Sequence, residues 1–354
     1  MQVCALLVLL LGLVGGARVS RVAVVGGGPG GLALAVSLGR LPSGVAEVAV
    51  FEARDVLSTR VGGGLQLSGG AKVCELLGEL PALRERAEGF LRVVGRNKHR
   101  RVLLDMDVGE AVRKSKESGL QAAADGEPLL YSVMRSSLQE LLFDACQKPG
   151  STKISVKSQS KVVEISKRQG KYALVFADGS ESEDYDMVFG CDGVNSAVRD
   201  YVFSGSPSAQ SITALYPKYS GIRVGYMITE PDPGFASRPA GRGAFHQWFG
   251  DGVYVMEASY GSTEGPQHML IVVYRDANDA MFGVNAGWSE ASLKSQLLGR
   301  LERGGLDRIE EVAMLSAAAE RTIDVGVREA ILPLPRWSSE DGRVVLMGDS
   351  AHAM

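Results

Sequence analysis

From Val19 onward the hydrophobic positions follow the order strand, glycine turn, helix, strand. The β-branched run Val22–Val25 predicts a buried strand, and the small and aliphatic residues of Leu32–Leu41 predict a helix. A second apolar run, Val48–Phe51, predicts another strand that ends at Glu52. The segment has about the 30 residues of one βαβ unit, so it predicts two parallel strands joined by a crossover helix.

Shorter elements are predicted over the next part of the chain, where apolar runs alternate with polar turns. Met187–Gly190 predicts a buried strand, and the polar, mixed-charge stretch Gly109–Gly126 predicts a surface loop. The further predictions are an amphipathic helix at Ala71–Leu80, a hairpin of Leu91–Val94 with Val102–Leu104, a helix from Ser136 to Cys146, and strands at Lys161–Ile165 and Tyr172–Phe176.

The pattern changes between Tyr201 and Asp276, where longer segments alternate apolar and polar residues and include aromatics. Such alternation predicts an antiparallel sheet, and we expect one of its faces to line a pocket in a second domain. A helix at Glu290–Arg303 and a strand at Arg343–Met347 follow. The predicted strands of the sheet are Gly221–Ile228, Ala244–Phe249, Val253–Tyr260 and His268–Tyr274.

Composition narrows the class of protein. The chain has 354 residues, enough for two domains at about 150 residues each, and 45% hydrophobic with 22% charged residues is typical of globular proteins. A net charge of −3 provides no basic excess for a phosphate backbone, which argues against nucleic-acid binding. The four cysteines form no CxxC pair and there is no histidine cluster, so no metal site is predicted.

The N-terminal segment is apolar over Val3–Ala17 and ends in small residues before Arg18. This pattern predicts a signal peptide at residues 1–17, but it lacks a basic start, so a short membrane anchor and a mis-assigned start codon stay as alternatives. A real leader would place the protein in the secretory pathway or at a membrane; otherwise we expect it in the cytoplasm or an organelle. Membrane association is predicted through this segment alone.

The first glycine turn carries the spacing Gly26-x-Gly28-x-x-Gly31, with Glu52 at the end of the following strand. The first glycine permits the strand-to-helix turn, the second lets the backbone approach a pyrophosphate, and the third lets the helix pack on the strand. The helix N-terminus presents free N–H groups to the diphosphate, and an acidic residue at this distance accepts from a ribose hydroxyl. Preceded by a strand and followed by Glu52, the motif predicts a dinucleotide site.

Two further motifs follow apolar strands. Gly190–Arg199 reads Gly-Cys-Asp-Gly-Val-Asn-Ser-Ala-Val-Arg, and Gly348–His352 reads Gly-Asp-Ser-Ala-His. Each places an aspartate, Asp192 or Asp349, at the carboxyl end of a strand, where open α/β sheets bind ligands. Taken alone, either aspartate could instead be a helix N-cap or a turn residue.

In this order the three motifs resemble those of the FAD-dependent aromatic hydroxylases, the group A flavoprotein monooxygenases typified by p-hydroxybenzoate hydroxylase and salicylate hydroxylase. Arg60–Ser68 resembles the family's loop beside the flavin, and Met134–Leu142 resembles its Arg-x-x-Leu helix start. Pro333–Trp337, ahead of the last strand, is also similar. The resemblance runs from about Val19 to the last residue. The sheet segment between Tyr201 and Leu332 matches only in its general pattern of apolar and polar residues.

The resemblance implies roles for eleven cofactor-binding residues. It assigns the FAD diphosphate to the glycine turn, the adenosine ribose to Glu52 and the ribityl or ribose part of FAD to Asp349. It implies no catalytic side chain and no metal ligand. The residues concerned are Gly26, Gly28, Pro29 and Gly31 in the turn, Glu52, Arg54 near the adenine, Gly64 on the flavin side, Arg135 as a FAD contact, Asp192 and Gly193 for FAD and NAD(P)H, and Asp349.

The resemblance also implies the fold. It predicts an α/β protein in which a Rossmann-like FAD-binding domain, of the glutathione reductase and p-hydroxybenzoate hydroxylase type, is interleaved with an antiparallel β-sheet substrate domain. The expected FAD-binding domain comprises residues 18–88, 130–200 and 340–354. The expected substrate domain comprises residues 89–129 and 201–339.

The implied activity is that of an NAD(P)H-using monooxygenase, which inserts one oxygen atom from O2 into a small molecule through a flavin peroxide. The expected substrate is an aromatic or other unsaturated compound, with isoprenoid rings included. The alternative is an FAD-binding relative, a reductase or an inactive protein or fragment, without full monooxygenase activity. No Trp-x-Trp signature of a halogenase is present. The sequence distinguishes neither NADH from NADPH nor one substrate from another.

Three minor predictions concern single features. We expect His352 to be a structural cap near FAD, with a role as a base as the alternative. We expect Trp248 and Phe249 to pack in the core, with a place in the pocket wall as the alternative. In the family the Gly-Asp motif leads into a further loop and helix, whereas this sequence stops at Met354. We expect a fragmentary gene sequence to explain this, a true C-terminal truncation being the alternative.

Overall fold

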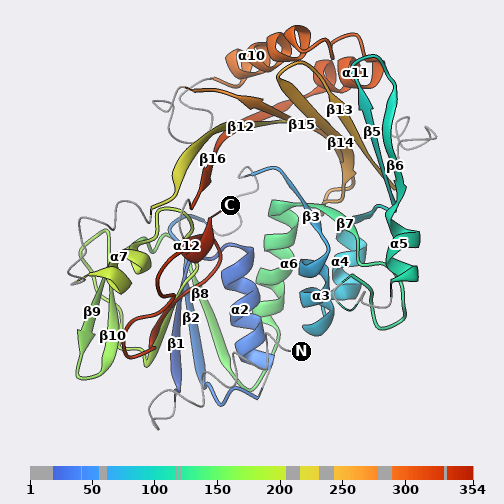
Figure 1. The fold of residues 1–354 in the computed structure, drawn as a ribbon. Helices are drawn as coiled ribbons and strands as arrows, with labels where there is room; N and C mark the ends of the chain where they lie inside the picture. Colours follow the sequence, from blue (N-terminus) through green and yellow to red (C-terminus); the bar gives the residue numbers. More distant parts are fainter. Residues whose placement is uncertain are drawn as a thin grey trace. The chain divides into compact units, whose positions relative to one another are not determined.

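The computed structural model describes residues 19–40, 42–55, 62–115, 119, 121–204, 216–230, 243–277, 289–330 and 333–353. The predicted signal peptide lies outside the described residues. The chain forms two compact units (Figure 1). The first comprises Met1–Ser58, Gln139–Lys218 and Arg328–Met354, and the second comprises Thr59–Leu138 and Tyr219–Val327.

A five-stranded parallel sheet is the centre of the first unit. Its strand order is β17 (Val344–Leu346), β11 (Met187–Gly190), β1 (Arg21–Val25), β2 (Glu47–Phe51) and β8 (Lys153–Lys157), and every neighbouring pair is parallel. The predicted βαβ unit is confirmed, with α2 (Pro29–Arg40) as its crossover helix. The remaining elements are α6 (Arg135–Gln147), which begins in the second unit, α7 (Ala197–Phe203), α12 (Asp349–His352) and the antiparallel pair β9 (Val162–Arg168) and β10 (Lys171–Phe176).

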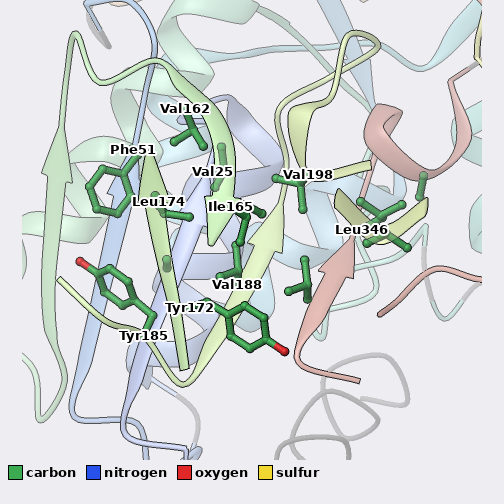
Figure 2. Close-up of a cluster of buried hydrophobic side chains, with 14 of the residues drawn as sticks. Val25, Phe51, Val162, Ile165, Tyr172, Leu174, Tyr185, Val188, Val198 and Leu346 are labelled. Atoms are coloured by element: carbon green, nitrogen blue, oxygen red, sulfur yellow. The ribbon is translucent and has the colours of Figure 1, made fainter. Parts of the chain in front are cut away.

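The core of the first unit lies between this sheet, the β9–β10 pair and α7. Figure 2 shows its side chains, among them Phe51, Tyr172, Tyr185 and Leu346. The middle residues of β1 are fully buried, as expected for a strand covered on both faces. Continuous β-branched and apolar runs therefore form the central strands, which holds the glycine turn after β1 on a rigid base.

The second unit contains a seven-stranded sheet and a three-stranded sheet. The larger has the order β16 (Arg321–Glu329), β12 (Lys218–Ile228), β15 (Gln267–Arg275), β14 (Val253–Tyr260), β13 (Ala244–Phe249), β5 (Arg92–Asn97) and β6 (Val102–Asp107). The smaller has the order β3 (Gly64–Leu67), β7 (Tyr131–Met134) and β4 (Glu88–Gly89). The helices are α3 (Gly69–Leu76), α4 (Leu80–Arg86), α5 (Val108–Lys114), α10 (Glu290–Arg303) and α11 (Glu310–Ala318).

The two faces of the seven-stranded sheet differ in what covers them. α10 and α11 pack on one face, where Leu293, Leu297 and Leu301 join a cluster with Met227 and Trp248 (Figure 1). The other face carries a second apolar cluster, whose buried members are Met134, Ile228, Phe245, Ala258, Tyr260, Met269, Ile271 and Ile323. The predicted antiparallel sheet is present, although β13 and β5 pair in parallel.

Two predicted elements are wrong. The helix at Ala71–Leu80 is broken into α3 and α4, because Gly78 adopts a left-handed φ of 70° and Pro81 starts a new helix. The predicted loop at Gly109–Gly126 begins inside α5, whose N-terminus is capped by the Asp107 carboxylate accepting from the Glu110 amide. No helix among the described residues is long and apolar enough to cross a membrane.

Candidate FAD-binding site

The four sequence features that predict a dinucleotide site follow four adjacent parallel strands. The glycine turn follows β1, Glu52 follows β2, Asp192 follows β11 and Asp349 follows β17. Because the strands are parallel, their carboxyl ends meet at one edge of the sheet, where open α/β sheets bind ligands. Residues separated by more than 300 positions in the sequence are thereby gathered along one edge.

Glycine is required at two positions of the turn. Gly26 has a φ of 105°, and a Cβ there would lie 2.2 Å from the carbonyl oxygen of Cys191. A Cβ on Gly31 would lie 2.0 Å from the carbonyl oxygen of Gly26. These contacts bring the turn, the start of α2 and the Cys191–Gly193 loop together without side chains between them. Glycine spacing in the sequence thus corresponds to backbone packing in the structure.

The N-terminus of α2 is a suitable place for a phosphate. Pro29 is the first residue of this helix, and the first intrahelical hydrogen bond is donated by the Leu32 amide to the Gly28 carbonyl oxygen at 3.0 Å. The helix therefore leaves the amides of Gly30 and Gly31 without a partner. No acidic residue occupies the first turn. The helix therefore presents donors and a partial positive charge that no side chain of this turn neutralises.

Glu52 lies beside the glycine turn. Its Oε2 accepts from the Gly27 amide at 2.8 Å, and its Oε1 accepts from the Arg54 amide at 3.0 Å. These bonds fix the carboxylate at the end of β2 and leave each oxygen with further acceptor capacity. The Arg54 side chain is exposed. Glu52 thus fits a ribose hydroxyl, while the proximity of Arg54 to an adenine stays a prediction.

Asp192 braces its own loop. Its carboxylate accepts from the Ser196 hydroxyl at 2.6 Å and from the Val198 amide at 3.2 Å. Burial raises the pKa of Asp192 above its ordinary value, although these hydrogen bonds act in the opposite direction. Gly193 follows with a φ of 77°, and nothing lies within 4 Å of where its Cβ would be. The N-cap residue of α7 is Ser196, so Asp192 supports this helix start from outside it.

Asp349 is the first residue of α12 and is exposed. Gly348 before it has a φ of 60°, which turns the chain from β17 into this short helix. The next residue, Ser350, is fully buried and its hydroxyl lies 2.6 Å from the Gly190 carbonyl oxygen. The buried serine anchors the turn to β11 and leaves the aspartate side chain in solvent at the sheet edge.

Arg199 and Gln139 hold the site together, although the sequence assigned them no role. Arg199 is 2% exposed, and its guanidinium donates to the carbonyl oxygens of Ser350, at 3.1 Å, and Val194, at 2.5 Å. It therefore ties the second motif to the third. Burial lowers the pKa of Arg199. Gln139 is 7% exposed, and its Nε2 donates to the Gly27 carbonyl oxygen at 2.7 Å.

The last two predicted residues, Gly64 and Arg135, belong to the second unit. Gly64 begins β3 and Arg135 begins α6, and the Arg135 amide donates to the Gly63 carbonyl oxygen at 3.0 Å. A Cβ on Gly62 would lie 2.8 Å from Cδ of Arg135. The glycine loop Gly62–Gly64 thus contacts the start of α6. The sequence prediction had grouped residues 62–64 and 135 with the FAD-binding domain.

The aromatic predictions have separate outcomes. Trp248 is 2% exposed and its Nε1 donates to Oε2 of Glu257 at 3.3 Å, so it is a core residue as expected. Phe249 is 42% exposed and pairs with Tyr254, with 5.0 Å between ring centroids, so it is not a core residue. His352 is exposed in α12 and its ring lies 5.4 Å from that of Trp337.

Comparison with known proteins finds monooxygenases among the similar proteins. No protein-family model matches the chain. The 3-amino-4-hydroxybenzoate 2-monooxygenase PtmB3 of Streptomyces platensis is 26% identical over 344 residues, covering 94% of this chain and 74% of the relative. The 6-hydroxynicotinate 3-monooxygenase of Pseudomonas fluorescens is 28% identical over 342 residues, with coverages of 94% and 76%. The expected resemblance to FAD-dependent monooxygenases is confirmed.

Solved structures share the fold of the chain. Klebsiella pneumoniae HpxO complexed with FAD and uric acid superposes with a TM-score of 0.70 at 20% identity, covering 97% of this chain and 75% of that one. CtdE in complex with FAD and a substrate gives a TM-score of 0.69 at 16% identity, with coverages of 94% and 74%. The expected α/β fold is confirmed.

Proposed function

We propose that the chain binds FAD and uses NAD(P)H and O2 to insert one oxygen atom into an aromatic or other unsaturated small molecule. In the balanced reaction NAD(P)H supplies two electrons, one oxygen atom enters the substrate and the other leaves as water. The observation that carries the proposal is the alignment of the glycine turn, Glu52, Asp192 and Asp349 along one edge of the parallel sheet. The two relatives named above support it, since both are named as monooxygenases of hydroxylated aromatic acids.

The described residues fit FAD in the first unit. The amides at the start of α2 would hold the diphosphate, and Glu52 would accept from the adenosine ribose. Asp349 would contact the ribityl or ribose part, and Asp192 with Gly193 would shape the neighbouring backbone. We propose the first unit as the FAD-binding domain and the second as the substrate domain.

Bound FAD would supply the redox chemistry, and the protein would supply binding and orientation. Gly64 and Arg135 would contact the flavin end of FAD. The glycine loop Gly62–Gly64 has no side chains, so its backbone would allow the cofactor to come close. Positioning a ring and excluding water require no protein nucleophile. Arg199 and Gln139 would act on the cofactor only through the backbone segments that they brace.

The proposal is tested with the purified full chain. We expect yellow protein or uptake of added FAD, oxidation of NADH or NADPH that an aromatic substrate accelerates, and a product that carries one atom from ¹⁸O2. A chain that takes up no FAD would refute the proposal. FAD uptake with NAD(P)H oxidation that no substrate accelerates and that yields no oxygenated product would favour the reductase alternative.

Glu52→Gln provides the matched test of the site. Loss of the charge-assisted hydrogen bonds to the ribose should weaken FAD binding by about 2 kcal/mol, roughly thirtyfold. Glu47→Gln is the control, because Glu47 lies at the start of the same strand, where it pairs with Arg21 Nε at 2.9 Å. Fluorescence titration with FAD measures both. Equal affinities for the two variants would exclude Glu52 from the site.

A further inference from the structure

The glycine turn contains one peptide whose direction its own residues do not fix, the peptide between Gly27 and Gly28. Neither residue has a Cβ, so rotation about the backbone bonds that flank this peptide meets little steric resistance. In a trans peptide the C=O and the N–H point in opposite directions. A rotation of this peptide would therefore exchange the sides to which the Gly27 carbonyl oxygen and the Gly28 amide point.

Gln139 of α6 holds this peptide in place. Its Nε2 donates to the Gly27 carbonyl oxygen at 2.7 Å. The peptides on either side are held by other groups. The Gly27 amide donates to Oε2 of Glu52 at 2.8 Å, and the Gly28 carbonyl oxygen accepts from the Leu32 amide at 3.0 Å. The direction of the peptide between them therefore depends on Gln139.

Burial shows to which side each group of this peptide points. Gly27 is buried and Gln139 is 7% exposed, so the Gly27 carbonyl oxygen points into the interior, toward α6. Gly28 is partly exposed, and none of the residues that the structure describes accepts from its amide. The hydrogen bond from Gln139 thus directs the Gly28 amide away from the interior, to the side where α2 begins.

The Gly28 amide adds a donor to the start of α2. Pro29 has no N–H, so this position contributes none. The amides that remain for an anion are those of Gly28, Gly30 and Gly31. A peptide rotated by half a turn would present the Gly27 carbonyl oxygen at this place, and its partial negative charge would repel a phosphate.

We propose that Gln139 is a positioning residue that aims the Gly28 amide at the FAD diphosphate without touching the cofactor. The inference rests on the proposed function, because it takes the start of α2 as the diphosphate site. An amide that is held in place before the ligand arrives binds an anion more tightly than one that must first be reoriented. Removal of the side-chain donor should therefore weaken the binding of ligands that carry a diphosphate, and leave the contacts of the adenosine part in place.

Gln139→Met separates positioning from a general effect on the fold. Methionine is an unbranched side chain of similar length that donates no hydrogen bond. Isothermal titration calorimetry on the full chain should show FAD and ADP bound about tenfold more weakly than by the wild type, and adenosine within about twofold. Gln147→Met is the control, since Gln147 is exposed at the end of the same helix and should change none of the three affinities. Equal losses for ADP and adenosine, or no loss for ADP, would overturn the inference.

Gln139→Glu provides a rescue that a merely structural role would not show. An ionised carboxylate cannot donate to the Gly27 carbonyl oxygen, whereas a protonated carboxyl can. The loss of FAD affinity relative to the wild type should therefore be largest near about pH 8 and shrink to within about threefold near about pH 5. A loss that does not change with pH would overturn the inference. A wild-type chain that binds neither FAD nor ADP would refute the proposed function and the inference with it, whereas a wild type that binds both, with the wrong pattern in the variants, would refute the inference alone.

Discussion

Two kinds of residue define the candidate site, and only one kind can be recognised in the sequence. Gly26 and Gly31 belong to a fixed local spacing, and the structure shows why no side chain fits at either position. Arg199 and Gln139 act across 151 and 112 positions of the sequence. Their partners are backbone carbonyls, which every residue possesses, so no pattern of residue types could identify them.

Gly26→Ala should destabilise the first unit strongly. The added Cβ would meet the Cys191 carbonyl, and alanine disfavours a φ of 105°. We expect a loss of about 3 kcal/mol or more in the free energy of unfolding, measured by urea denaturation. Gly30→Ala is the control, because nothing lies within 4 Å of its Cβ position and a helical alanine is favoured. A Gly26→Ala protein as stable as Gly30→Ala would contradict the packing described.

Elements were predictable where one local pattern decides them. The predicted bounds of β11, β13, β14 and α10 agree with the structure, since each is a clear apolar run or amphipathic repeat. The failures lie where capping overrides periodicity, as at Gly78 between α3 and α4 and at Asp107 before α5. β8 was missed because the polar residues of Lys153–Lys157 hide a strand at the sheet edge.

Asp341 joins the β9–β10 pair to the segment before β17. Burial alone would raise the pKa of Asp341, but hydrogen bonds from Lys167, Ser339 and Tyr172 outweigh it and hold the pKa well below the ordinary range. The lysine Nζ lies 2.6 Å from Oδ2, and the Asp341 side chain is 31% exposed. A carboxyl with a lowered folded-state pKa stabilises the fold above its unfolded-state pKa, and this contribution is lost as the pH falls through the folded-state pKa.

Asp341→Asn should therefore reduce stability at pH 7 by about 1–2 kcal/mol, a difference that shrinks as the pH is lowered. Urea denaturation between neutral and acid pH measures it. Glu340→Gln serves as the control, since the Glu340 side chain is 88% exposed and should contribute within about 0.5 kcal/mol. A constant difference between wild type and Asp341→Asn at all pH values would contradict the assigned cause.

At the scale of the whole molecule, the order of motifs predicted the resemblance to FAD-dependent monooxygenases and the α/β fold, but the sequence does not contain the strand order. β17, formed by the last part of the chain, lies beside β11, and β13 pairs with β5 in parallel across more than 140 positions. Such pairings depend on non-local packing. The division between units likewise follows contacts, which place Thr59–Leu138 with the seven-stranded sheet.

FAD should stabilise the whole chain if the sheet edge of the first unit binds it. A ligand that binds only the folded state adds about 2.7 kcal/mol at a hundred times its Kd. For a chain of this length that amounts to a rise in Tm of roughly 4 °C, measured by differential scanning fluorimetry in an FAD titration.

The control ligands follow from the groups at the sheet edge. Because the glycine turn and Glu52 would hold the diphosphate and the adenosine ribose, ADP should produce part of the shift in Tm, whereas FMN, which lacks the adenosine half, should produce little. Glu52→Gln should raise the FAD concentration needed for half of the Tm shift. At saturating FAD, the variant's Tm should lie below that of the wild type only by the difference that the two chains show without FAD. FMN as effective as FAD would show that the adenosine half makes no contribution, and would contradict the roles assigned to the glycine turn and Glu52.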